Sequence, residues 1–248
     1  KAAWVSVSGN KSDGSPLMGR KAQRKIVTAA MKSAIDASTD LREDSRAFNL
    51  IAAPGYPELI PNMVALNNDR RSTAFVVGDS PLRLATGGTA VANWASNANV
   101  AAEDGEDGLI TSDPYAAVFY PAGRTNDLSG NTIVVPSSHA ALRTIIRSDE
   151  QSFPWFAPAG TRRGLLDNVS AIGYINSVTG EFVVDNVTEG MRDTLYSNRV
   201  NPMTFINGYG LMNYGNKTRA AGTSALDRIN VSRLVSFLRR SLQDYATN

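Results

Sequence analysis

Three short apolar runs, each closed by a turn, recur in the first half of the chain. They occupy residues 48–53, 73–77 and 115–120, and the turns that follow are Pro54-Gly55, Gly78-Asp79-Ser80-Pro81 and Pro121-Ala122-Gly123. Continuous apolar runs of this length are typical of strands that are buried on both faces, which is the situation in a parallel sheet. The pattern therefore predicts a parallel sheet built from these three segments.

Helical patterns separate and flank the predicted strands. Residues 57–69 and 87–99 lie between them, and residues 21–35 precede them with one apolar stripe. Residues 132–136 read as a further strand, after which Ser137 or Ser138 is expected to cap a helix that runs through Ile145 and Ile146. Residues 1–8 alternate between apolar and polar side chains and predict one more short strand. Alternation of strands and helices predicts an α/β layer structure with right-handed crossovers.

The pattern changes after residue 150. Residues 153–158 carry two prolines and several aromatic residues, which predicts an extended segment that crosses the domain and is anchored by its rings. A helix is expected over 187–198, ending before Asn201-Pro202. Residues 203–206 and 209–214 read as strands joined at Asn207-Gly208, a sequence that favours a tight hairpin.

The last apolar pattern predicts an amphipathic helix over residues 228–245. One face carries Val231, Leu234, Val235, Leu238, Leu242 and Tyr245. We expect Arg233 and Arg240 to point away from this face and Arg239 to lie on its flank. The predicted fold is therefore α/β (α+β overall), with a mixed, largely parallel sheet flanked by helices and followed by a C-terminal hairpin and amphipathic helix.

Composition places the chain among globular proteins. Its 248 residues are 42% hydrophobic and 19% charged, and its net charge of +2 is too balanced to indicate a nucleic-acid-binding protein. Cysteine is absent, which excludes disulfides and thiolate metal sites. No apolar run approaches the roughly 20 residues of a membrane-spanning helix. Because the chain does not begin with Met, we interpret it as a fragment or a processed piece.

Two segments superficially suggest enzyme chemistry. His139 is the only histidine, but the sequence offers it no recognisable nucleophile or orienting acid, so we interpret it as structural. Residues 210–218 nearly match a phosphate-binding P-loop. However, Asn216 separates Gly215 from Lys217, no buried parallel strand precedes the segment, and Gly222 interrupts any helix after it. A hairpin strand and turn is the preferred interpretation.

Charged clusters give two further candidates. The acidic residues of 103–108 could hold a hard cation, but they lack the ligand spacing of an EF-hand, so a solvated loop is preferred. The basic faces of the helices at 21–35 and 228–245 lack the interleaved aromatic residues or glycines of a nucleic-acid reader. No catalytic, cofactor-binding or metal-binding residue is predicted.

Two ordered motifs carry a resemblance to a known family. The first has the form Trp-x-x-Pro-Ala-Gly-x-x-Arg-Gly, and the second has the form Asp-Arg-Ile-Asn-Val-x-Arg-Leu and opens the last helix. The residues that match are Trp155, Pro158, Ala159, Gly160, Arg163 and Gly164, and then Asp227, Arg228, Ile229, Asn230, Val231, Arg233 and Leu234. The chain thereby resembles the contractile tail sheath proteins of myovirus-type bacteriophages, specifically over 150–248 and less specifically back to about residue 20.

The resemblance implies a structural protein with no enzyme activity and no cofactor. Sheath subunits form hexameric rings around a tail tube, meet a baseplate, and contract to drive the tube through the host envelope for genome ejection. The implied partners are other sheath subunits, the tube protein and the baseplate, with neither nucleic acid nor membrane. The implied location is the tail of the virion, after assembly in the host cytoplasm.

The resemblance also implies a division of the chain. Residues 1–150 correspond to the α/β core of a middle domain, 151–226 to its continuation, and 227–248 to the start of the C-terminal sheath domain. Because the region after the second motif lies toward the tube in the family, Arg233, Arg239 and Arg240 are candidate assembly or tube contacts. Strand-adding linking arms are expected to be missing from this chain.

Three alternatives stay open at this point. The arginines of the last helix can simply solvate its exposed face. The sheath can belong to a bacteriocin or secretion-type contractile system, since the motifs do not separate these from a phage. A nucleotide- or metal-binding α/β enzyme, or a host-surface adhesin, remains the rival class.

Overall fold

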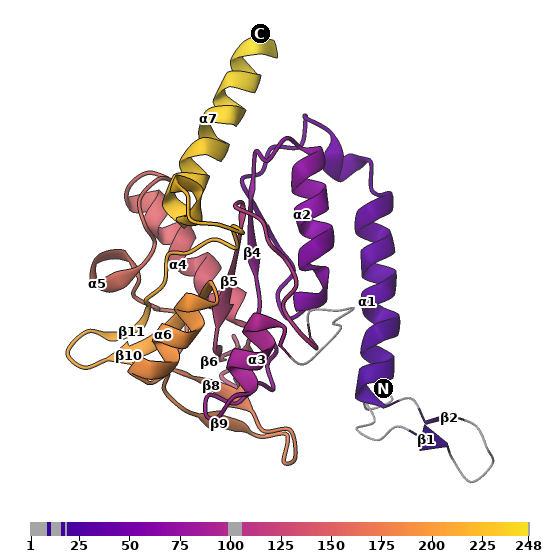
Figure 1. The fold of residues 1–248 in the computed structure, drawn as a ribbon, viewed down its shortest axis with the longest axis vertical. Coiled ribbons are helices and arrows are strands. Elements are labelled where there is room, and N and C mark those ends of the chain that lie inside the picture. The colour runs from indigo at the N-terminus through magenta and orange to yellow at the C-terminus, as the bar shows by residue number, and fades with distance from the viewer. Residues whose placement is uncertain (1–8, 11–15, 18, 99–105, 248) are drawn as a thin grey trace.

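The computed structural model describes residues 9–10, 16–17, 19–98 and 106–247, and its sheet of five strands lies between two groups of helices (Figure 1). The helices are α1 (Arg20–Ala37), α2 (Ile60–Asp69), α3 (Ala90–Ser96), α4 (Ser137–Gln151), α5 (Gly160–Arg163), α6 (Glu189–Ser197) and α7 (Ile229–Thr247). Single 3-10 turns lie at Asp40–Arg42, Pro57–Leu59 and Ala225–Asp227. The strands are β1 (Gly9–Asn10), β2 (Pro16–Leu17), β3 (Leu50–Ala52), β4 (Phe75–Gly78), β5 (Ala116–Tyr120), β6 (Ala122–Asn126), β7 (Thr132–Val135), β8 (Ala171–Ile175), β9 (Phe182–Val184), β10 (Val200–Ile206) and β11 (Gly210–Asn213).

The central sheet has the order β11-β10-β5-β4-β3, in which β3, β4, β5 and β10 run parallel and β11 is antiparallel to β10. The three strands predicted from apolar runs are all present, and β4 and β5 are buried along their whole length. Successive side chains of a strand point to opposite faces. Val76 and Val118 accordingly pack with α2, α3 and α6, whereas Phe75 and Phe119 pack with α4 and α7.

The helices that directly precede β4, β5 and β10 in the chain all lie on the same face of the sheet. The strands follow one another in the order β3, β4, β5 and β10 without reversal, and the connecting helices α2, α3 and α6 all contribute to one apolar core. Doubly wound enzymes bind ligands in the crevice formed where the strand order reverses. The described strands of this sheet show no such reversal.

A second, antiparallel sheet follows β5 and has the order β7-β6-β8-β9. Its strands lie below the central sheet in Figure 1, on the side away from the protruding end of α7. The predicted strand at 132–136 is confirmed as β7, which belongs to this sheet rather than to the parallel one.

Several boundaries differ from the sequence prediction. Strand β10 begins at Val200 and so includes Asn201 and Pro202, which were predicted to lie between a helix and a strand. The buried amide of Asn201 explains this, because it donates to Val118 O at 3.1 Å and to Lys217 O at 2.8 Å and ties the strand to β5. The hairpin at Asn207-Gly208 is confirmed, with Gly208 at a positive φ of 82° that favours glycine. The strand predicted at 1–8 lies outside the described residues.

The predicted serine cap of α4 is wrong. Pro136 holds the N-cap position, and no side-chain cap bond is formed there. Ser138 instead donates from its backbone N to Asp79 at 2.6 Å and from its hydroxyl at 3.0 Å. The serines at the start of α4 therefore donate hydrogen bonds to a buried carboxylate at the end of β4.

Candidate assembly surface

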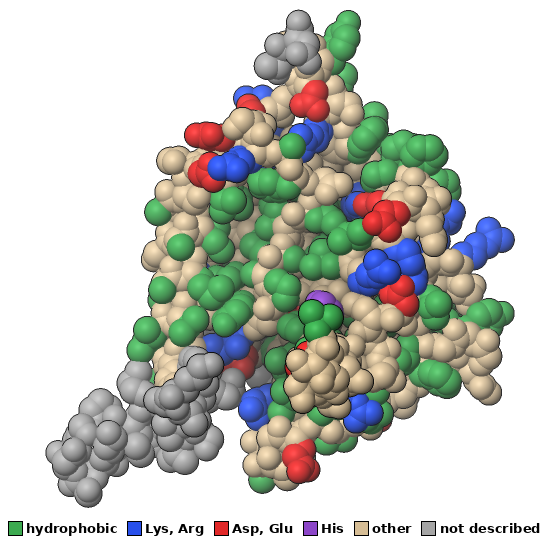
Figure 2. Space-filling model, turned by 180° about the vertical axis from the view of Figure 1, so that it is seen from behind, with side chains coloured by type: hydrophobic (Ala, Val, Ile, Leu, Met, Phe, Trp, Pro, Cys, Tyr) green, Lys and Arg blue, Asp and Glu red, His purple; other side chains and the backbone are tan. Residues whose placement is uncertain are grey.

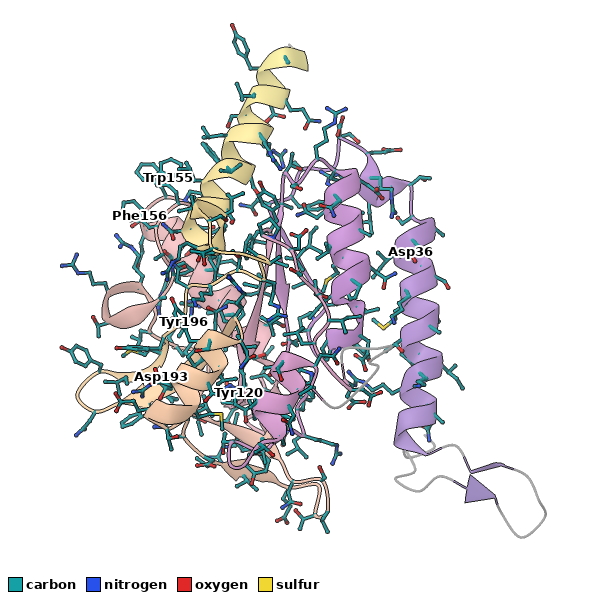
Figure 3. All side chains as sticks on the ribbon, viewed as in Figure 1. Asp36, Tyr120, Trp155, Phe156, Asp193 and Tyr196 are labelled. Atoms are coloured by element: carbon teal, nitrogen blue, oxygen red, sulfur yellow. The ribbon has the colours of Figure 1, made fainter. Side chains whose placement is uncertain are left out.

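The two sequence motifs meet where α7 joins the body of the protein. Trp155 lies with its ring centroid 5.3 Å from that of Phe237 on α7, and Phe153 stacks on Trp155 at 4.7 Å. Figure 3 shows Trp155 and Phe156 beside the lower turns of this helix. The segment turns back on itself at Phe153–Phe156 rather than crossing the domain, so that part of the prediction is wrong. The rings of Trp155 and Phe153 nevertheless anchor the segment, as predicted.

The rest of the first motif docks a tight loop onto β11. Asn213 donates from its side chain to Pro158 O at 2.8 Å and from its backbone to Gly164 O at 2.7 Å. A Cβ on Gly164 would lie 2.4 Å from Asn213 O, so only glycine allows the two backbones to approach this closely. Arg163 lies over the ring of Phe156 at 4.3 Å, and Gly160 takes a positive φ of 72°. These motif residues are therefore structural supports of the loop.

The second motif fixes the start of α7. Asp227 accepts a backbone hydrogen bond from Thr218 N at 3.0 Å, and its carboxylate lies 3.3 Å from the guanidinium of Arg228. Arg228 also donates to the hydroxyl of Tyr196. Asn230 accepts from the side chain of Asn216 at 2.8 Å. These bonds hold the first turn of α7 against the loop that follows β11.

The predicted orientation of α7 is wrong for its first half. The buried residues of this half are Ile229, Ser232, Arg233 and Ser236. Arg233 is 3% exposed and forms a two-bond ion pair with Asp149 of α4, with Nη1 at 2.8 Å from Oδ1. The interpretation of Arg233 as part of a solvated face is therefore incorrect, because its charge is compensated inside the protein.

Arg239 and Arg240 lie closer to the surface than Arg233. Arg239 donates to Arg71 O at 3.3 Å and lies 4.9 Å above the centre of the Tyr115 ring. Arg240 donates to Phe48 O at 3.3 Å and lies 3.7 Å from Asp244 one helical turn later. Both side chains contact the body of the protein, yet Arg239 is exposed and Arg240 is only half-buried.

The outer half of α7 presents apolar side chains to solvent. Its exposed hydrophobic residues are Phe237, Leu238, Leu242 and Tyr245, with exposed fractions that rise from 42% to 85%. Figure 1 shows this half extending beyond the rest of the fold. A contiguous apolar stripe on a protruding helix is typical of a surface that contacts another polypeptide.

The segments that suggested enzyme chemistry have structural roles. Lys217 lies over the ring of Tyr196 at 4.2 Å, and Gly215 packs against Asn201, so residues 210–218 form a hairpin strand and turn. The expectation that no buried parallel strand precedes this segment is wrong, because β10 is buried over most of its length and pairs in parallel with β5. His139 lies in the first turn of α4, where its carbonyl accepts a bond from Asn168. Within the acidic segment, Glu106 lies 3.5 Å from Arg24, and residues 103–105 fall outside the described part.

The described residues contain no group of three or more His, Cys, Asp or Glu side chains placed to hold a metal ion. Across the same residues, no helix combines the length and apolarity that a membrane span requires. On the face drawn in Figure 2, basic and acidic side chains lie next to one another without one extended basic field.

The burial of Asp79 was not predicted from the sequence. Asp79 is 2% exposed at the end of β4 and also accepts from Gly55 N at 2.6 Å. Burial raises the pKa of Asp79 to about 6, although the bonds from Ser138, Gly55 and Ser137 act in the opposite direction. Asp79 joins the ends of β3 and β4 to the start of α4, which makes it a structural junction.

Sequence comparison identifies two related phage proteins. The tail sheath protein of Vibrio phage KVP40 is 31% identical over 169 residues, which span 64% of this chain and 23% of the relative. The tail sheath protein of Enterobacteria phage T4 is 28% identical over 181 residues, which span 70% of this chain and 25% of the relative. The chain thus spans about a quarter of the length of these curated relatives. No family model matches the sequence.

Solved structures of contractile assemblies share the fold. The sheath complex of the PVC extracellular contractile injection system in its contracted state aligns with a TM-score of 0.59 at 18% identity, over 89% of this chain and 51% of that one. The contracted helical sheath of the anti-feeding prophage aligns with a TM-score of 0.54 at 20% identity, over 87% of this chain and 49% of that one. These matches confirm the resemblance read from the two motifs: the chain is similar in sequence to a segment of two phage tail sheath proteins, and its fold is shared with two sheath structures of contractile systems.

Proposed function

We propose that this chain is part of a structural subunit of a contractile tail sheath, which polymerises around a tail tube and contracts to drive the tube through a host envelope. The observation that carries the proposal is the sequence relationship to two phage tail sheath proteins, over 64% and 70% of the chain. The shared fold of contracted injection-system sheaths supports the same role independently.

A phage tail is the favoured setting, with hexameric rings as the form of assembly, the virion as the location and the host cytoplasm as the place of assembly. The related sequences are phage proteins, whereas the fold is shared with an extracellular injection system and an anti-feeding prophage. A bacteriocin or secretion-type sheath is therefore the second candidate. Partners in the phage setting are other sheath subunits, the tube protein and the baseplate, and a baseplate structure is among the fold matches.

A structural rather than enzymatic role agrees with the fold. The residues of both motifs within the described chain make intramolecular contacts that position α7 and its neighbouring loop. A rigid body that presents a protruding helix suits a subunit whose contacts change between two lattices while its own fold is retained.

The part of α7 that we assign to assembly is its outer half. It carries exposed Leu238, Leu242 and Tyr245 together with Arg239 and Arg240. Within the proposed division of the chain into 1–150, 151–226 and 227–248, this helix opens the last part. Arg239 and Arg240 are the preferred candidates for contact with the tube, because Arg233 is already paired with Asp149.

Immunogold electron microscopy tests the proposal. Antibody fragments raised against residues 19–98, which include the exposed face of α1, are applied to intact contractile particles that contain the protein. Label repeated along the sheath is expected. Label restricted to capsid, fibres or tube would overturn the proposal, and particles that lack the gene product serve as the control.

A further inference from the structure

A polar cavity of about 270 Å³ opens near the start of β5 and β10. It lies between the ends of α3 and α6, and its walls include the hydroxyl-bearing residues Ser96, Ser112 and Ser197. Arg199 and Arg219 also line the cavity and bring two guanidinium groups to it. This cavity has no role in the contacts described so far.

Arg219 brings a charge into this cavity without a carboxylate partner among the described residues. Its Nε donates to Thr111 O at 2.9 Å and its Nη1 donates to Asn198 O, and both acceptors are neutral backbone carbonyls. Burial, followed by the nearby charge of Arg199, lowers the pKa of Arg219 to about 10. The side chain is therefore held in a place where a negative charge would be favourable.

Arg199 is the less satisfied of the two. It follows the end of α6 with a positive φ of 59°, a conformation that arginine rarely adopts. Its Nη1 is buried and has no hydrogen-bond partner within the described part of the chain. A buried donor without an acceptor is unfavourable. Because Arg199 also lines the cavity, a carboxylate placed there would compensate the charge of its guanidinium group.

The surroundings of the cavity are also basic. The charges of Arg199 and Arg228, after burial itself, lower the pKa of Lys217. Asp227 is the carboxylate that faces this group, and it lies against Arg228 at 3.3 Å. Beside Arg199, the cavity therefore has Lys217 and Arg228 as neighbouring cations, and Asp227 is already paired with Arg228.

We propose that the Arg199–Arg219 cavity binds one carboxylate group, presented by an aspartate or glutamate on the surface of a partner protein. A planar guanidinium matches a carboxylate through paired hydrogen bonds. The cavity has room for one side chain rather than a folded element. The proposal stands on the isolated chain and does not depend on the sheath function.

The test uses two peptides that differ only in charge, N-acetyl-Gly-Glu-Gly-amide and N-acetyl-Gly-Gln-Gly-amide. Each is titrated into the isotope-labelled chain at fixed ionic strength, and the amide NMR signals of Ser112, Arg199 and Ala220 are followed. The glutamate peptide is expected to give saturable shifts at these positions, and the glutamine peptide is expected to give none. Arg199→Gln is expected to weaken binding of the glutamate peptide at least about tenfold, because it removes the charge-assisted hydrogen bonds from the guanidinium to the carboxylate.

Control variants separate the site from general electrostatics. Arg192→Gln removes a surface charge from α6 and should leave the peptide affinity unchanged, whereas Arg199→Lys should weaken it less than Arg199→Gln does. Equal weakening by Arg192→Gln, or no shift with the glutamate peptide, would overturn the proposal. Equal shifts with inorganic phosphate would show an unselective anion site and overturn it as well.

The chain's own acidic segment must also be tested as the occupant. Residues 103–105 lie outside the described part, so Glu103→Gln with Asp104→Asn is compared with the wild-type chain without peptide. The proposal expects unchanged signals for Arg199 and Ala220. Shifts at these positions in the double variant would mean that the cavity is filled from within the same chain, which contradicts a partner site.

Discussion

Loss of the Arg233–Asp149 ion pair should destabilise the fold far more than loss of an exposed pair. The perturbation is Arg233→Met, which keeps an apolar stem of similar length and removes the charge. Arg233 is 3% exposed and Asp149 is 19% exposed, so the change leaves a carboxylate that is largely removed from water and has lost its ion-pair partner. Breaking a buried pair from one side costs about 3–5 kcal/mol, and the partial exposure of Asp149 places this case near about 3 kcal/mol.

The chain offers a matched control for this change. Arg46 and Asp40 form an ion pair whose side chains are 60% and 59% exposed. Arg46→Met should lower the free energy of unfolding by no more than about 1 kcal/mol, because exposed pairs contribute little. The double variant Arg233→Met with Asp149→Leu should recover most of the loss, since an apolar pair of similar volume replaces two buried charges.

The assay is urea denaturation, followed by circular dichroism and tryptophan fluorescence. The expected order of stability is wild type, then Arg46→Met and the double variant close to it, and Arg233→Met well below. If Arg233→Met and Arg46→Met differ by less than about 1 kcal/mol, the assignment of Arg233 as an internal anchor of α7 is refuted.

Three further changes test other parts of the account by the same denaturation assay. Gly164→Ala should lower the free energy of unfolding by roughly 2–3 kcal/mol, because the new Cβ would lie 2.4 Å from Asn213 O. Gly190→Ala, whose Cβ would have no atom within 4 Å, should be neutral or slightly stabilising. Equal effects of the two changes would contradict the close backbone approach at Gly164. Trp155→Ala should cost about 2 kcal/mol through loss of its ring contacts, and Tyr245→Ala, 85% exposed, should change stability by less than about 0.5 kcal/mol. In the folded protein the pKa of Asp79 is raised from 3.8 to about 6, so the stability that this group contributes is present below pH 4 and is lost as the pH rises through 6. The difference in unfolding free energy between wild type and Asp79→Asn should therefore change by up to about 3 kcal/mol between pH 4 and pH 7. A difference that does not depend on pH would contradict this.

Local pattern predicted the sheet because burial on both faces leaves a continuous apolar run. The segments that became β4 and β5 are buried along their whole length, so no polar position interrupts their pattern. The helix over 57–69 and the hairpin at Asn207-Gly208 were predicted for similar reasons, since each is specified by neighbouring residues.

The orientation of α7 could not be predicted in this way. Its buried side carries Ser232, Arg233 and Ser236, residues that a periodicity argument assigns to solvent. Arg233 is buried because Asp149, 84 positions earlier, lies opposite it, and Ser236 is positioned to donate to Ala74 O, 162 positions earlier. The apolar side chains Leu238, Leu242 and Tyr245 stay exposed in this chain, so the hydrophobic pattern at these positions did not mark a core.

Contacts between residues that are distant in sequence also determine the roles of polar residues in the fold. Asn201, Asp79 and Arg219 act through partners that are distant in sequence, and nothing in the residues beside them announces those partners. The motifs around Trp155 and Asp227 could be read from the sequence, but their physical role could be described only once Phe237 and Asn216 were seen beside them.

The central claim is that this chain belongs to a sheath that contracts. The most direct measurement is the length and diameter of the region labelled by gold-tagged antibody fragments on particles imaged before and after triggered contraction. The account predicts that the labelled region becomes shorter and wider while the number of labelled positions stays constant. A labelled region whose length does not change on contraction, as a tube or fibre protein would give, would contradict the account.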